Sequence, residues 1–414
     1  MNRREFLQLA VLSTSGFLLL DGNGWTARAM DDDKNPNPKR LVVVFLRGAV
    51  DGLNVVVPYS DSSYYVSRPT IAVPRPNESG GALRLDSHFG LHPSLTPVMP
   101  FWEKGSLAFI HASGSPDPSR SHFDAQDYME TATPGLAKTP DGWLNRLLGV
   151  LPGTRSSSEA LSVGPTLPRI LSGKVPAANL PLGKAGTRPM PLDRPEIQAA
   201  FDRLYSGNDP LSIAYREGEV SRKKLLAELT QEMQMADQGA PSPVGFGDEA
   251  KNLGVLMARD PSLKIAFIAL GGWDTHINQG SIQGQLSNRL NALGELLATF
   301  VQALGPAYAD TMILVMSEFG RTVHENGNTG TDHGHGNVMW VMGGNVRGGK
   351  VYGQWPGLSG NELYEGRDLA VTTDFREVIS VVLESQFGLT GTQLGKVLPH
   401  GPKPKQETRE ILRA

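Results

Sequence analysis

The chain has 414 residues, with 39 basic and 42 acidic side chains, a formal net charge of −3 and no cysteine. This charge balance lacks the excess of basic side chains that is typical of nucleic-acid-binding proteins. The lack of cysteine excludes disulfides, thiolate metal ligands and a cysteine nucleophile, and the length allows one large domain or two ordinary ones.

The N-terminal 29 residues are predicted to be an export signal. Arg3 and Arg4 precede an apolar run over residues 9–20, which the small residues Ala27 and Ala29 follow. The run is too short to span a bilayer, and these features occur in the order of a twin-arginine (Tat) signal that is cut after Ala29. An uncleaved anchor is the alternative. Cleavage removes three arginines and two acids and leaves a charge of −4. We expect a periplasmic or secreted product without a stable membrane span, and the Tat translocase as its partner during export.

Continuous apolar runs rich in β-branched residues predict strands that are buried on both faces. Two amphipathic patterns predict helices, one with a leucine stripe and one that begins at a Thr/Asp cap and stops at Gly388. Buried strands that alternate with helices predict an α/β fold around a mostly parallel sheet. The predicted strands are residues 41–46, 106–112, 263–270, 311–316 and 338–342, and the predicted helices are 285–304 and 372–388.

The middle of the chain differs in composition from the rest. Residues 151–196 are rich in Pro, Gly and Ser, and residues 197–240 have the pattern of polar helices. We therefore predict one α/β domain in two parts with an insertion or cap between them. The boundaries are a disordered leader at 30–40, the first part at 41–150, the insertion at 151–258, the second part at 259–400 and a C-terminal tail at 401–414.

Polar side chains follow the ends of the predicted strands. The carboxyl ends of strands in an open α/β sheet share one edge where ligands bind, so we expect these clusters to meet. They are Arg47 and Asp51 after 41–46; Ser119, Arg120, Ser121, His122 and Asp124 after 106–112; Asp274 and His276 after 263–270; Ser317, Glu318 and Arg321 after 311–316; and Asp332, His333 and His335 before 338–342.

The residue types in these clusters predict a divalent metal site. Asp, Glu and His without sulfur suit Zn, Mn, Mg or Ca, and imidazoles favour Zn or Mn. Asp274 and His276 are two residues apart, so an extended segment would turn both to one side, and His333 and His335 have the same spacing. A purely structural polar cluster is the alternative. The predicted ligands are Asp51, Asp274, His276, Glu318, Asp332, His333 and His335.

Several of these residues have a structural alternative. Asp51 precedes Gly52 and would then only form an Asx turn. Glu318 and Arg321 would form a salt bridge with each other. Arg120 would either bind a phosphate or sulfate group through its planar fork or clamp the neighbouring loop.

The longer motifs resemble a known family. "FLRGAVDGLNVVVPY", "RSHFDAQDYME", "GGWDTH", "MSEFGRTVHENG" and "TDHGHGNVMWVMGG" are similar to an exported bacterial family of unknown function that is assigned to the alkaline phosphatase and sulfatase superfamily. The resemblance covers about residues 40–400. It implies a three-layer α/β/α sandwich, one or two divalent metals, and hydrolysis or transfer of phosphate or sulfate esters through a Ser, Thr or modified Cys at a helix start.

The resemblance assigns roles to individual residues. Asp51 matches the superfamily's first-strand metal aspartate, Asp274 with His276 resembles its Asp/His metal pair, and His333 or His335 would be its late metal histidine. "SEFG" at 317–320 keeps the superfamily's acid as Glu318 but has Phe319 where a histidine is usual, which argues against a second metal. "SPDPSR" is similar to the sulfatase nucleophile signature, although strict alignment puts Pro116 at the nucleophile. Ser121, at the predicted start of a helix, is the preferred nucleophile.

The sequence therefore predicts an exported, metal-dependent hydrolase of a small-molecule or glycan ester of phosphate or sulfate. Ser121 or a bound water would be the nucleophile, and the metal would lower its pKa. Arg47, Arg120 or Arg321 would take up the negative charge on the transferring oxygens. The alternative is a non-catalytic extracytoplasmic protein that keeps the fold and binds a partner or a glycan.

Overall fold

The computed structural model describes residues 38–136, 139–153, 155–180 and 237–413. The predicted Tat signal, most of the predicted leader and the polar helical pattern up to residue 236 lie outside these residues. Among the residues described, no helix is both long enough and apolar enough to cross a membrane.

One mixed sheet forms the centre of the described chain. Its strands are β1 (Arg40–Leu46), β5 (Leu107–Gly114), β6 (Ala160–Val163), β7 (Ala178–Leu180), β8 (Ile265–Leu270), β9 (Thr311–Ser317), β10 (Asn337–Gly343), β11 (Lys350–Tyr352) and β12 (Thr373–Asp374). The strand order is β11-β5-β10-β9-β1-β8-β6-β7, and β12 pairs with β5. Neighbouring strands are parallel except at β10, which is antiparallel to both β5 and β9.

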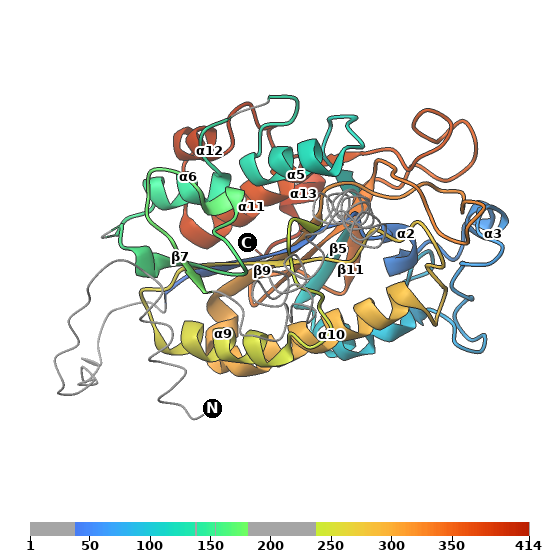
Figure 1. The fold of residues 1–414 in the computed structure, drawn as a ribbon, viewed down its shortest axis with the longest axis horizontal. Coiled ribbons are helices and arrows are strands. Elements are labelled where there is room, and N and C mark those ends of the chain that lie inside the picture. Colours follow the sequence, from blue (N-terminus) through green and yellow to red (C-terminus); the bar gives the residue numbers. More distant parts are fainter. Residues whose placement is uncertain (1–37, 137–138, 154, 181–236, 414) are drawn as a thin grey trace, which may run out of the picture. The chain divides into compact units, whose positions relative to one another are not determined.

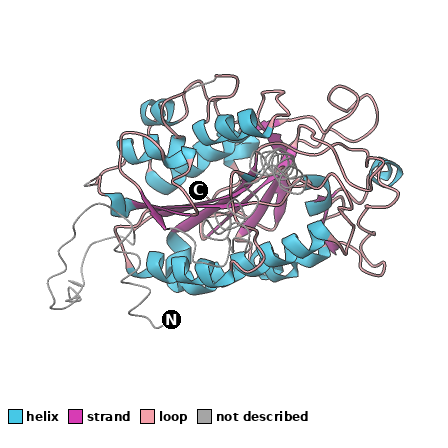
Figure 2. Cartoon of the chain, viewed as in Figure 1, coloured by secondary structure: helices cyan, strands magenta, loops and turns pink. Residues whose placement is uncertain are grey.

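Helices cover both faces of this sheet (Figures 1 and 2). One face carries α5 (His122–Thr131), α6 (Trp143–Val150), α11 (Phe375–Phe387), α12 (Gly391–Val397) and α13 (Gln406–Arg409), and the other carries α9 (Gly247–Arg259) and α10 (Gln285–Leu304). The three-layer α/β/α sandwich with a mostly parallel sheet, which the sequence predicts, is confirmed.

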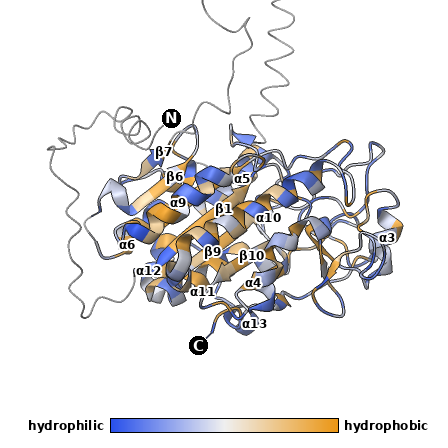
Figure 3. Cartoon of the chain, turned by 90° about the horizontal axis from the view of Figure 1, so that it is seen from below, coloured by the Kyte–Doolittle hydropathy of each residue, from blue (hydrophilic) through white to orange (hydrophobic). Residues whose placement is uncertain are grey.

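Strand β1 shows why the sheet must be covered on both faces. Alternate side chains of a strand point to opposite faces, and in β1 every side chain is apolar except that of Arg40. Leu41, Val43 and Phe45 belong to one hydrophobic core, whereas Val42, Val44 and Leu46 belong to the other. Figure 3 shows the apolar strands behind helices whose outward faces are more polar.

The two predicted helices form where their patterns place them. Helix α10 buries Leu290, Leu293 and Leu297 against the sheet. Helix α11 begins after Asp374, whose side chain accepts a hydrogen bond from the Arg376 amide, and ends at Gly388, whose φ of 64° is left-handed. Such a cap and such a terminal glycine satisfy backbone groups at the helix ends.

Short elements complete the fold. A second sheet has the order β2-β4-β3. The remaining elements are β2 (Val56–Val57), β3 (Leu83–Arg84), β4 (Gly90–Leu91), α2 (Gly52–Val55), α3 (Ser62–Ser67), α4 (Met99–Glu103), and the 3₁₀ helices η1 (Pro93–Val98), η2 (Ser157–Glu159), η3 (Arg169–Leu171) and η5 (Gly305–Asp310).

Two segments outside the predicted α/β domain belong to it. Within the predicted insertion at 151–258, β6 pairs with β8 and β7 pairs with β6, and α9 lies beside α10. The predicted boundaries therefore enclose parts of the sheet domain, because strands as short as "ALSV" and "ANL" give little signal in a Pro/Gly/Ser-rich stretch. The predicted tail is docked, since Thr408, Ile411 and Leu412 are buried.

Candidate metal centre

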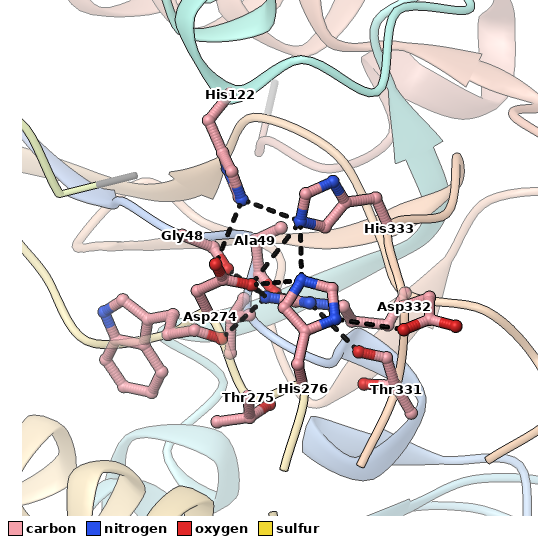
Figure 4. A network of polar contacts seen from close by, with 12 residues as sticks. Gly48, Ala49, His122, Asp274, Thr275, His276, Thr331, Asp332 and His333 are labelled. Carbon is pink, nitrogen blue, oxygen red and sulfur yellow. Dashed lines mark hydrogen bonds and ion pairs between the residues drawn. The ribbon is translucent and has the colours of Figure 1, made fainter. Parts of the chain in front are cut away.

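Three loops bring a cluster of imidazoles and carboxylates to one edge of the sheet (Figure 4). Asp274 and His276 lie in the loop after β8, and His122 is the first residue of α5, which follows β5. His333 lies in the loop before β10. This last loop reaches the same edge because β10 runs antiparallel to its neighbours, so that it begins where they end.

Close packing explains the glycines around His333. A Cβ atom added to Gly330 would lie 2.3 Å from the carbonyl oxygen of His276, and one added to Gly334 would lie 2.4 Å from the carbonyl carbon of Arg321. Both contacts are too short for any side chain. The glycines therefore let this loop pack directly on the backbone of the loops after β8 and β9, which brings His333 to the cluster.

The side-chain atoms of four residues converge in this cluster. Nε2 of His333 lies 2.9 Å from Nε2 of His122 and 2.9 Å from Nε2 of His276. Asp274 Oδ1 is 3.0 Å from His276 Nε2 and 3.5 Å from His333 Nε2, and its Oδ2 is 3.6 Å from His122 Nε2. His122, Asp274 and His333 each offer a ligand atom within 4.8 Å of the others.

The other ring nitrogen of two of these histidines faces an acceptor. Nδ1 of His122 lies 2.7 Å from Oε1 of Glu318, and Nδ1 of His333 lies 2.9 Å from the carbonyl oxygen of Arg120. Since neither acceptor can donate, both Nδ1 atoms must carry the proton. The neutral ring then presents an unprotonated Nε2 to the cluster.

His276 follows the same rule. Its Nδ1 lies 3.0 Å from Oδ1 of Asp332, which also accepts from the side-chain amide of Asn326 at 3.0 Å. Each of the three imidazoles thus presents an Nε2 lone pair to the cluster. Metal-binding histidines commonly donate their second N–H to a carboxylate or a carbonyl in this way.

The separations fit a metal ion. Ligands about 2.0–2.2 Å from an ion such as zinc, at angles of roughly 90–120°, lie about 2.9–3.7 Å from one another. The distances of 2.9–3.6 Å among His122, Asp274 and His333, and from His276 to Asp274 and His333, fall in this range. Unprotonated nitrogens 2.9 Å apart repel each other unless a proton or a cation lies between them. The donor set of three imidazoles and one carboxylate suits Zn or Mn.

Arg321 holds the carboxylate of the cluster. Its guanidinium donates to Asp274 Oδ1 at 2.6 Å, and also to the backbone carbonyls of Ala49, Thr331 and Trp273. Burial alone would raise the pKa of Asp274, but the three neighbouring imidazoles and the charge of Arg321 outweigh it and hold this pKa well below its usual value. Asp274 is therefore an anion at any physiological pH.

The histidines have different affinities for protons. Burial opposes a charge on His122, but the carboxylates of Asp274 and Glu318 outweigh it and raise the pKa of His122 to about 9. Burial, assisted by the charges of His122 and Arg321, lowers the pKa of His333. Without a metal ion, Nε2 of His122 is thus expected to be protonated and to donate a hydrogen bond to Nε2 of His333.

Two predicted ligands touch other groups. Glu318 is fully buried and contacts His122 rather than the point where the Nε2 atoms meet; its Oε1 also accepts from the Gly48 amide at 2.8 Å. Asp51 accepts two hydrogen bonds from Arg68, at 2.6 and 3.0 Å, and a third from Gln279 at 2.7 Å. A carboxylate satisfied in this way is not available to a metal ion, so the structure does not bring Asp51 into the cluster.

His335 also turns away from the cluster. The chain bends at this residue instead of continuing as an extended segment. Its buried ring stacks on Tyr364, with the ring centroids 4.4 Å apart. The spacing of His333 and His335 therefore does not form a chelating pair.

The residues predicted for catalysis have partners of their own. Arg47 forms a buried ion pair with Glu130. Arg120 pairs with Asp368 at 2.7 Å and with Glu365 at 2.6 Å.

Ser121 caps helix α5, where its Oγ accepts from the Asp124 amide at 3.4 Å. His122, the next residue, is the member of the cluster that was not predicted from the sequence as a ligand. Its position in the first helical turn after a strand end is the sequence signal that indicates it.

The sequence model of a family described as "Protein of unknown function (DUF1501)" matches residues 38–400. The chain belongs to this family. No curated protein matches the DUF1501 chain in sequence.

Solved structures similar to this DUF1501 chain are distant. PsFucS1 sulfatase from Pseudoalteromonas sp. is 12% identical with a TM-score of 0.40, over 91% of this chain and 76% of that chain. A protein in the alkaline phosphatase superfamily from Vibrio parahaemolyticus is 11% identical with a TM-score of 0.38, over 77% and 64%. The C-terminal periplasmic domain of EcEptC from Escherichia coli, in complex with Zn, is 10% identical with a TM-score of 0.35, over 75% and 73%.

Proposed function

We propose that the chain is a metal-dependent hydrolase of a phosphate or sulfate ester, with one Zn or Mn ion held by His122, Asp274, His276 and His333. The convergence of three Nε2 atoms and one carboxylate carries this proposal. Each Nδ1 is tied to an acceptor, so the orientation of the three rings is fixed with Nε2 toward the cluster.

The cluster is open to solvent on one side, as a catalytic centre requires. The side chains of His276, Asp274 and His333 keep 38%, 28% and 26% of their surface exposed, whereas that of His122 keeps only 9%. A divalent ion at this point would polarise an ester oxygen and lower the pKa of the attacking hydroxyl. Glu318 and Asp332 would hold the imidazoles of His122 and His276 in place during the reaction.

Of the three predicted arginines, Arg120 is the best placed to contact a substrate. Its carbonyl accepts from His333, and its guanidinium is 30% exposed and shared between buried Asp368 and Glu365, which is 53% exposed. An anionic ester could displace the exposed Glu365. Arg47 and Arg321 are buried with partners, so their proposed role is to hold the site rather than to bind the ester.

The same contacts favour a single metal. Asp51, a predicted ligand, is neutralised by Arg68 at 2.6 Å. Phe319 lies against the imidazoles of His122 and His333, with ring centroids 4.9 and 5.1 Å away, and offers no ligand atom. We expect one ion per chain.

We also propose that the Tat signal directs the chain to the periplasm or the medium. The paired Arg3 and Arg4 support this proposal. Replacing both by Lys should leave the chain in the cytoplasm of a bacterium with a working Tat pathway. Unchanged export of the double variant would contradict this part of the proposal.

Metal analysis combined with an ester screen tests the function. Purified protein should contain about one Zn or Mn per chain and should cleave an aryl phosphate or an aryl sulfate. Asp274→Ala should abolish cleavage. Ser121→Ala separates the two nucleophiles, since it should abolish cleavage if the hydroxyl attacks and spare it if water does. Absence of bound metal, with no cleavage after Zn or Mn is added, contradicts the proposal.

A non-catalytic binding protein is the second candidate. The engagement of Arg47, Arg120 and Arg321 by carboxylates favours it, because no arginine of the predicted set is left without an acidic partner. In that case the metal is structural, and Asp274→Ala lowers the melting temperature without removing any ester-cleaving activity.

A further inference from the structure

Gln279 contacts two of the three segments that carry the proposed metal ligands. Its Oε1 accepts hydrogen bonds from the hydroxyl of Thr275 at 2.8 Å and from that of Thr331 at 2.9 Å. Thr275 lies between Asp274 and His276, and Thr331 lies two residues before His333. The side chain thus joins the segment after β8 to the segment before β10.

An anchor fixes the orientation of this amide. Nε2 of Gln279 donates to Oδ2 of Asp51 at 2.7 Å. Turning the amide over would bring its oxygen against the carboxylate, so the arrangement with Oε1 toward the two hydroxyls is fixed. Gln279, Thr275 and Thr331 are all buried, where a polar group without a partner is costly.

Arg68 in turn fixes Asp51. All five N–H groups of the Arg68 guanidinium have acceptors: both oxygens of Asp51, the side chain of Asn54, and the backbone carbonyls of Thr322 and Val323. Arg68 and Asp51 are buried. A pair held by this many hydrogen bonds is a rigid support for Gln279.

We propose that Gln279 is a positioning residue of the metal centre, which clamps the Asp274–His276 segment to the segment that carries His333. This inference rests on the metal centre proposed above. The amide does not touch the ion. It sets the distance between two ligand-bearing loops through their threonines, and Asp51 and Arg68 serve the centre only by holding the amide. This gives a structural role to Asp51, which follows β1 at the same edge of the sheet but lies outside the cluster.

Gln279→Met tests the clamp, and Gln386→Met is its matched control. Methionine has nearly the same length and cannot join the loops. Gln386 is also buried, and its Nε2 donates to the carbonyls of Arg40 and Asp310, at the opposite ends of β1 and β9 from the metal centre. Both substitutions should lower the melting temperature. The readouts are Co²⁺ affinity, measured by competition with a chelator, and the visible absorption of bound Co²⁺.

The clamp predicts that Gln279→Met lowers Co²⁺ affinity about ten- to hundredfold, as the loss of outer-shell partners usually does, and alters the absorption bands. Gln386→Met should leave both as in the wild type. Thr275→Val, a smaller change, should lower the affinity in the same direction and serves if Gln279→Met does not fold. Wild-type affinity and spectrum in Gln279→Met, or in Thr275→Val if that is the variant measured, would overturn the clamp alone. Wild-type protein that binds no Co²⁺ would instead overturn the metal centre.

Discussion

Removal of metal should leave a proton on His122, and that proton should make the stability of the metal-free protein depend on pH. Although burial works against it, contact with Asp274 and Glu318 raises the pKa of His122 from 6.5 to about 9. A histidine with a raised pKa stabilises the fold fully below pH 6.5 and loses this contribution as the pH rises toward 9. The difference between the two pKa values, about 2.5, corresponds to roughly 3 kcal/mol.

Urea unfolding of chelator-treated protein between pH 6.5 and 9.5 measures this dependence. Over this pH range, the unfolding free energy of the wild type should fall by about 3 kcal/mol more than that of His122→Gln, which lacks the titrating ring. The metal-loaded protein should show the opposite trend, because a bound ion needs unprotonated imidazoles and its affinity rises with pH. Parallel curves for the metal-free wild type and His122→Gln would refute the assignment of the proton to this ring.

Three further predictions concern the cluster and the core. Asp274→Asn removes the anionic ligand and should reduce metal affinity by more than the roughly hundredfold limit usual for outer-shell changes; an unchanged affinity in chelator competition would exclude Asp274 as a ligand. His111 is buried, and although its hydrogen bond to the Val56 carbonyl opposes the effect of burial, its pKa is lowered to about 4. Its contribution to stability is full above pH 6.5 and is lost as the pH falls toward 4, by roughly 3 kcal/mol, so His111→Gln should show a shallower acid transition in urea unfolding at pH 4–7. Leu293→Ala empties a fully buried position between α10 and the sheet and should cost about 2–5 kcal/mol in the same assay; a loss below about 1 kcal/mol would contradict the packing described.

The fold could be predicted because its strands are buried on both faces. Apolar runs at 41–46 and 311–316 contain almost no polar residue, so they predict β1 and β9 within one residue. The direction of β10 could not be predicted, since an apolar run does not encode whether its neighbours are parallel. The expectation that "TDHGHG" lies at the ligand edge depended on this direction. In a parallel strand, the preceding loop would lie at the opposite edge.

The candidate site could be predicted only in part. Strand ends show which residues reach one edge, and this was enough for Asp274 and His276, whereas the place of His333 also depended on the direction of β10. The final partner of each side chain depends on residues elsewhere in the chain. Asp51 is paired with Arg68, which caps the C-terminus of the short helix α3 and belongs to no metal motif. The orientation of His335 likewise depends on a residue elsewhere in the chain, because its ring stacks on that of Tyr364.

Diffraction from crystals of the protein, recorded at the absorption edge of the bound metal, tests the central claim most directly. We predict one anomalous peak per chain, in contact with Nε2 of His122, His276 and His333 and with a carboxylate oxygen of Asp274. A peak at Asp51, or imidazoles paired through hydrogen bonds with no peak between them after Zn or Mn is supplied, would contradict the account.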